Sequence, residues 1–99
     1  MRMMLRVQMA TEETNHAIEQ GELPNVMRQV SERLHPEAAY FTTQDGERTG
    51  YIFFDMKQTE QMPMVAEPMF MKLGAKVELT PAMTMDEVES GLRKAARVM

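Results

Sequence analysis

The strongest constraint on the fold is a turn signal near the middle of the chain, Asp45-Gly46, which lies between two strand-like runs. Ala38 to Gln44 and Arg48 to Met56 are rich in aromatic residues and Thr, which favour β-strands. An Asp-Gly pair accepts the positive φ angles of a tight hairpin turn, so the two runs are predicted to pair antiparallel. The resulting register places Tyr40 opposite Tyr51.

Strand parity divides the side chains of this hairpin between two faces. One predicted face carries Ala38, Tyr40, Thr42, Thr49, Tyr51, Phe53 and Asp55. The reverse carries Phe41, Ile52, Phe54 and Met56. Because the reverse is more apolar, we expect it to pack beneath helices.

A strand and a helix are predicted before the hairpin. Arg2 to Met9 alternates like a strand, and a helix should begin with Thr11 as its N-cap. A break or kink is expected between Gly21 and Pro24. Leu23, Val26, Met27, Val30 and Leu34 then form an apolar stripe, and the helix should end before Pro36.

A second helix and strand are predicted after the hairpin, followed by a last helix. Met62, Val65, Ala66, Met69, Phe70 and Leu73 have helical spacing, with Gly74 as the C-cap. Pro68 falls inside this helix and should kink it. Ala75 to Thr80 alternates as a strand, and Thr84 with Glu87 forms a capping box. The last helix has the stripe Val88, Leu92, Ala95, Ala96 and Met99.

The predicted order is β-α-β-β-α-β with an added C-terminal helix. We therefore expect an α+β, ferredoxin-like domain with an antiparallel four-stranded sheet and helices on one face. The 99 residues fit a single domain, residues 1–99, and contain no linker or repeat.

Composition excludes several classes of function. The chain has no Cys, which removes disulfides, thiolate catalysis and thiol-ligated metals, and favours a cytoplasmic location. The net charge of -4, without a basic cluster, argues against nucleic acid as a partner. Arg2 and Arg6 interrupt the apolar N-terminus, so no signal peptide or membrane anchor is expected. No cofactor motif is present, and we expect neither a cofactor nor a metal.

A homodimer is expected because helices cover only one face of such a sheet. The other face should present Met4, Tyr40, Tyr51 and Phe53 among Arg6, Gln8, Lys76 and Glu78. A contiguous apolar and aromatic patch usually marks an interface or a binding site. A two-fold contact with a second copy would cover it by using one patch twice.

The element order resembles the dimeric α+β barrel superfamily, whose ferredoxin-like chains pair sheet to sheet. More narrowly, four segments are similar to a family of small uncharacterised bacterial proteins: residues 36–41, 45–48, 66–70 and 75–78. The narrower resemblance implies a fold and no activity. The superfamily includes cofactor-free oxygenases, haem-degrading enzymes, lactone isomerases and small-molecule-binding regulatory domains, so fold alone does not choose among them.

Three functions remain open. The first is a homodimeric module that binds a small organic molecule between sheet and helices or between subunits, with Arg6, Tyr40, Tyr51, Phe53, Asp55 and Glu78 as candidate ligand-binding residues. The second is a cofactor-free oxygenase or isomerase, and the third is a non-catalytic assembly subunit.

For the enzyme, the candidate bases are His35, which follows a helix, and Glu67, which lies beside Pro68. Each has a structural alternative. His35 could complement the negative end of its helix, and Pro68 could merely kink its own. Arg6, Asp55 and Glu78 could equally form ion pairs.

Overall fold

A computed structural model describes residues 1–99, and its elements follow the order β-α-α-β-β-α-β-α. The strands are β1 (Arg2–Gln8), β2 (Ala38–Gln44), β3 (Glu47–Asp55) and β4 (Lys76–Pro81). The helices are α1 (Thr11–Glu19), α2 (Leu23–Leu34), α3 (Gln61–Leu73) and α4 (Met85–Val98). The predicted α+β class is confirmed, with two helices in the first connection.

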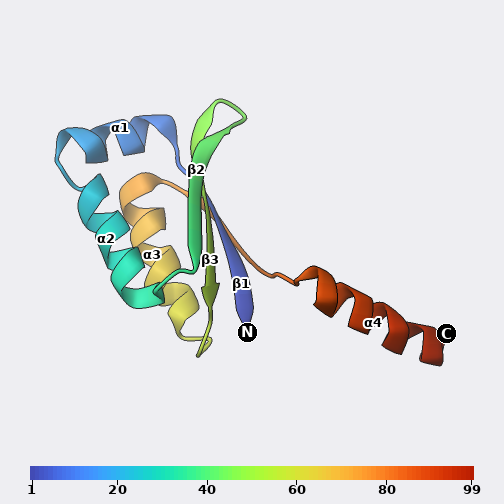
Figure 1. Cartoon of the computed structure of the whole chain (residues 1–99). Helices are drawn as coiled ribbons and strands as arrows, with labels where there is room; N and C mark the ends of the chain where they lie inside the picture. The colour runs from blue at the N-terminus through green and yellow to red at the C-terminus, as the bar shows by residue number, and fades with distance from the viewer.

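The four strands form one antiparallel sheet of order β2-β3-β1-β4. Helices α1, α2 and α3 cover one of its faces, and the other face carries no helix packed flat upon it (Figure 1). The hairpin register is confirmed, since Tyr40 pairs with Tyr51 and the turn residues Asp45 and Gly46 have φ angles of 53° and 77°. We call the uncovered side the open face.

The core lies between the sheet and the three covering helices. Its members include Leu5, Val7, Val26, Val30, Leu34, Ile52, Phe54, Val65, Met69 and Leu73. Two members of the predicted α3 stripe are outside it, since Met62 is 39 % exposed and Phe70 is 44 % exposed. Met62 belongs to the first turn of α3, and Phe70 lies at the edge of the buried stripe.

The break between α1 and α2 is confirmed. Gly21 has a φ of 70°, and Pro24 lies in the first turn of α2, where its missing N–H has no helical acceptor. The predicted N-cap was wrong, because Ala10 is the N-cap and Thr11 is the first helical residue. Helix α2 ends at Leu34, before Pro36, as predicted.

The predicted burial of Phe41 beneath helices was wrong, because its side chain is 58 % exposed. Strand β2 is an edge strand, whereas the buried residues of α2, including Val26 and Val30, pack with Leu5 and Ile52 of the inner strands. Helix α2 therefore leaves the helix side of β2 partly uncovered.

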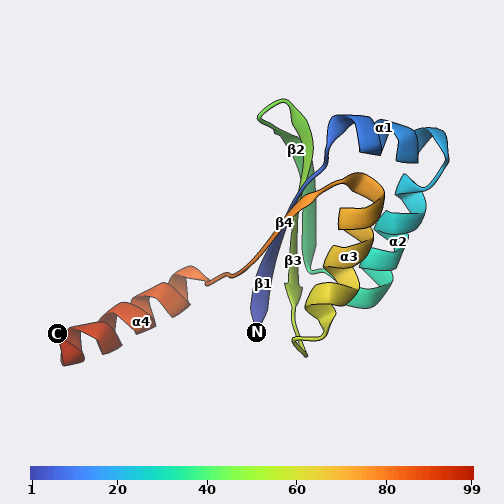
Figure 2. The ribbon, with the colours of Figure 1, turned by 180° about the vertical axis from the view of Figure 1, so that it is seen from behind.

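Helix α4 has the predicted capping box, in which Thr84 Oγ1 accepts from the Glu87 N–H and the Glu87 carboxylate accepts from the Thr84 N–H. None of its residues is buried. Seen from both sides, α4 projects away from the rest of the molecule and does not reach α3 (Figures 1 and 2). It therefore does not cover the exposed Met64 and Met71 of α3.

Candidate functional site

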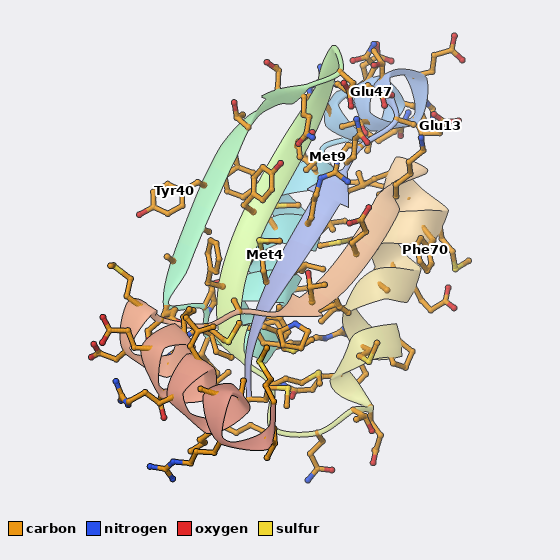
Figure 3. The ribbon with its side chains drawn as sticks, turned by 90° about the vertical axis from the view of Figure 1, so that its right-hand side faces the viewer. Met4, Met9, Glu13, Tyr40, Glu47 and Phe70 are labelled. Atoms are coloured by element: carbon orange, nitrogen blue, oxygen red, sulfur yellow. The ribbon has the colours of Figure 1, made fainter.

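The open face carries most of the predicted ligand-binding residues. Strand pairing aligns four of them in one row across the sheet, in the order Glu78, Arg6, Tyr51 and Tyr40. The neighbouring row contains Met4 and Phe53, which face each other across β1 and β3. Figure 3 looks onto this face, with Met4 near the middle of the sheet and Tyr40 at its outer edge beside β2.

Arg6 is the centre of a polar cluster in this row. Its side chain is only 15 % exposed, and Nη1 donates to Glu78 Oε1 at 3.1 Å. Arg6 Nε donates to Gln44 Oε1 at 3.4 Å, and the Tyr51 hydroxyl donates to the same oxygen. Hydrogen bonding with Tyr51 raises the pKa of the Arg6 guanidinium, against burial and together with the charge of Glu78.

One member of this cluster, Gln44, was missed by sequence reasoning. Gln44 bridges Arg6 and Tyr51 through its side chain, and its carbonyl oxygen accepts from Gln8 Nε2 at 3.0 Å. Parity on β2 would have placed Gln44 on the open face with Tyr40. No buried side-chain polar atom lacks a partner, so this cluster is satisfied within one chain.

Asp55 lies apart from Arg6 and Glu78, at the far end of β3, where it pairs across the sheet with Arg2. Its carboxylate accepts from Lys57 Nζ at 2.8 Å and from the N-terminal amine at 2.7 Å. The Lys57 hydrogen bond, followed by that of the amine, lowers the pKa of Asp55 to about 2. Asp55 therefore belongs to an exposed ion-pair group rather than to the Arg6 cluster.

The two candidate bases are exposed and take no part in the Arg6 cluster. His35 follows α2 in the left-handed conformation, with a φ of 47°, and lines a charged hollow with Arg2, Glu37, Asp55 and Glu87. No carboxylate lies within 4.0 Å of its ring nitrogens. Glu67 lies on the exposed side of α3, and the carbonyl freed by Pro68, that of Met64, accepts from Arg33 Nη1 at 2.9 Å.

An apolar pocket lies on the helix side of the sheet, where α2 leaves β2 uncovered. Its volume is about 400 Å³, within the range of small-molecule sites. It is lined by Met9, Leu23, Met27, Phe41, Thr42, Arg48 and Thr49. We call it the α2–β2 pocket, and its surface is almost entirely apolar.

Gly50 allows the Phe41 ring to form one wall of this pocket. Phe41 pairs with Gly50 across β2 and β3, and a Cβ atom on Gly50 would lie 2.9 Å from the ring. The ring thus lies where a side chain on β3 would otherwise stand. A smaller apolar pocket of about 190 Å³, which Met27 and Phe41 also line, adjoins the same ring.

Arg48 is the one charged residue that lines the α2–β2 pocket. Its Nη2 donates to Asn15 Oδ1 of α1 at 2.9 Å, which links the guanidinium to the helix layer. Arg48 is exposed, and its contact with Asn15 spans 33 positions in the chain, so it could not be read from the local sequence pattern.

No group of three His, Asp or Glu side chains comes together in a way that could hold a metal ion. None of the helices combines the length and the apolar character needed to cross a membrane. No protein-family model matches this chain, and no curated protein matches it either. The geometry therefore carries the functional argument.

Proposed function

We propose that this protein is a small-molecule-binding module and that its ligand occupies the α2–β2 pocket. The observation that carries the proposal is a volume of about 400 Å³ with almost entirely apolar walls, lined by one charged residue, Arg48. Binding sites for small organic molecules usually combine such walls with a few polar groups that orient the ligand.

The chemistry of the pocket favours a ligand with an apolar body and an anionic head. Met9, Leu23 and Met27 provide flexible and aliphatic surface, and the two thioether chains can adapt to different shapes. Arg48 can donate charge-assisted hydrogen bonds to a carboxylate or a sulfonate. The bond to Asn15 uses one of its donors and leaves the others for a ligand.

The ferredoxin-like interpretation of the fold belongs to this proposal. It is supported by the strand order β2-β3-β1-β4 and by the placement of α1, α2 and α3 on one face (Figure 1). The enzyme alternative has less support, because no carboxylate lies within 4.0 Å of the His35 ring nitrogens and Glu67 lines no apolar pocket.

The test uses octanoate as the probe and the methionine methyl groups as reporters. The 13 methionines can be labelled with ¹³C, and Leu substitutions at Met9 and Met27 assign the two signals of interest. Octanoate should shift the Met9 and Met27 methyl signals in a saturable way, because both residues line the pocket. Met71 and Met85, which are exposed and lie elsewhere, should not respond.

Two matched variants check the role of the cation. Arg48→Gln should weaken octanoate binding by about three- to tenfold, since it removes a charge-assisted hydrogen bond. Arg28→Gln removes the same charge from an exposed position of α2, where the side chain bonds to Asn25, and should leave binding unchanged. Unsaturable shifts spread over all methyl groups, or equal affinities in the two variants, would contradict the proposal.

A further inference from the structure

Helix α4 presents an apolar stripe that nothing in the chain covers. Its members, spaced by three or four residues, are Met85, Val88, Leu92, Ala95 and Met99. Leu92 is 65 % exposed and Val88 is 40 % exposed. An amphipathic helix in water normally buries such a stripe, because each exposed aliphatic side chain forgoes its hydrophobic stabilisation.

The molecule also exposes more surface than a compact monomer of its mass. A folded chain of 11.4 kDa is expected to expose about 5,800 Å², whereas this chain exposes 6786 Å². Its radius of gyration is 15.9 Å, against about 13 Å for a compact chain of this length. The excess of about 1,000 Å² is close to the roughly 800 Å² that each partner contributes to a standard interface.

The start of α4 is fastened to the sheet. Arg2 Nη1 lies 2.5 Å from Glu87 Oε1 in the capping box, and Arg2 Nε lies 3.4 Å from Glu37 Oε1. This contact fixes the first turn of α4 beside the N-terminal end of β1. From there the helix runs outward on the open-face side (Figures 1 and 3). In this arrangement α4 does not lie on the open face of its own sheet.

The open face is the second uncovered apolar surface of the same chain. Tyr40 is 67 % exposed, and Met4, Tyr51 and Phe53 are half-buried. The 14 residues of α4 extend about 21 Å, and the seven residues of β1 extend about 23 Å, so the helix matches the sheet in length.

We propose that α4 packs on the open face of a second copy of this chain, and that the two copies exchange these helices reciprocally. One two-fold operation then covers both surfaces. Helix α4 contains three acidic and three basic residues and so carries no net charge. The net charge of -4 on residues 1–84 therefore does not repel the helix of the second copy.

Sedimentation velocity on the full chain and on three variants tests the exchange. The wild-type protein should be a dimer at about 10 µM. Leu92→Asp, on the stripe, and Tyr40→Asp, on the open face, should each raise the dimer dissociation constant at least about tenfold. Both positions are exposed in a single chain, so far-UV circular dichroism should show an intact fold.

Ser90→Asp is the matched control, because it adds the same charge on the opposite side of α4 and should leave the dimer intact. A wild-type protein that is monomeric at this concentration would overturn the proposal. A response to Leu92→Asp without a response to Tyr40→Asp would overturn docking on the sheet in favour of helix–helix pairing. If all three variants dissociated alike, the added charge and not its position would be the cause, and this result would also contradict the proposal.

Discussion

The guanidinium of Arg33 on α2 donates a hydrogen bond of 2.9 Å to the carbonyl oxygen of Met64 on α3. Within a regular helix, this carbonyl would accept from the N–H of residue 68, but that residue is Pro68 and has none. A neighbouring helix thus supplies the donor that the proline removes. The proline inside α3 and the position of Arg33 on α2 are two parts of one arrangement.

A double-mutant cycle measures this relationship. Arg33→Met should destabilise the wild-type protein by about 0.5–1.5 kcal/mol, because the Met64 carbonyl loses its donor. In a Pro68→Ala background the main-chain N–H returns, so the same substitution should cost much less. Urea unfolding of the four proteins gives the coupling free energy. Equal costs in both backgrounds would show that the Arg33 bond does not compensate for the proline.

A comparison of two neighbouring residues of α3 tests where its buried stripe ends. Met69→Ala should destabilise the protein by about 2–5 kcal/mol, because Met69 is fully buried. Phe70→Ala should cost less than half as much, although it removes a larger side chain, because Phe70 is 44 % exposed. Urea unfolding measures both values. A larger loss for Phe70→Ala would place that ring in the core.

The ion pair of Asp55 predicts a specific dependence of stability on pH. Lys57 and the N-terminal amine lower its pKa from the usual 3.8 to about 2, so the folded state binds this proton less readily than the unfolded chain. The pair should stabilise the fold above about pH 4, and this contribution should disappear as pH falls toward 2. The effect should be small because all partners are exposed.

Thermal unfolding of the wild type and of Asp55→Asn, between pH 2 and 7, checks this window. The variant should be less stable at pH 5 to 7, and the difference should vanish near pH 2. Asp86→Asn is a suitable control, since Asp86 takes part in no ion pair. A difference that is constant with pH would mean that the carboxylate charge of Asp55 has no role.

The two edges of the sheet predict different tendencies to aggregate. Edge strand β4 carries Lys76, Glu78 and Pro81, which discourage the addition of a further strand, whereas β2 has no charged residue and no proline. Thr43→Lys should therefore slow aggregation at elevated temperature, as measured by light scattering. Thr80→Lys on β4 should change it little, and equal effects at the two edges would refute the idea.

Sequence patterns predicted the elements well because their causes are local. The Asp45-Gly46 turn set the hairpin register, Gly21 and Pro24 separated two helices, and Thr84 with Glu87 began the last helix. Each of these signals depends on residues a few positions apart. The wrong N-cap at Thr11 is also a local error of one residue, because sequence patterns place a helix start only to within a residue or two.

Predictions of the site were weaker, because the contacts that build it are not local. Arg6 meets Gln44, Arg48 meets Asn15, and Phe41 borders a pocket only because β2 lies at an edge. Asp55 shares strand parity with Tyr51 but lies at another end of the sheet, in an ion pair with Lys57. Strand parity predicts on which face of the sheet a side chain lies. Which side chains it contacts on that face depends on the order of the strands and on the length of the side chains.

By itself the sequence determined the kind and order of the elements, the hairpin register and the faces of the strands, because hydrophobic period and turn chemistry act over a few residues. Strand parity also indicated the open face around Arg6. Two other uncovered surfaces, the helix side of β2 at Phe41 and the stripe of α4, became apparent only from the packing of the whole chain, because coverage there depends on where distant elements lie. Both the binding pocket and the helix exchange proposed for this protein follow from those uncovered surfaces.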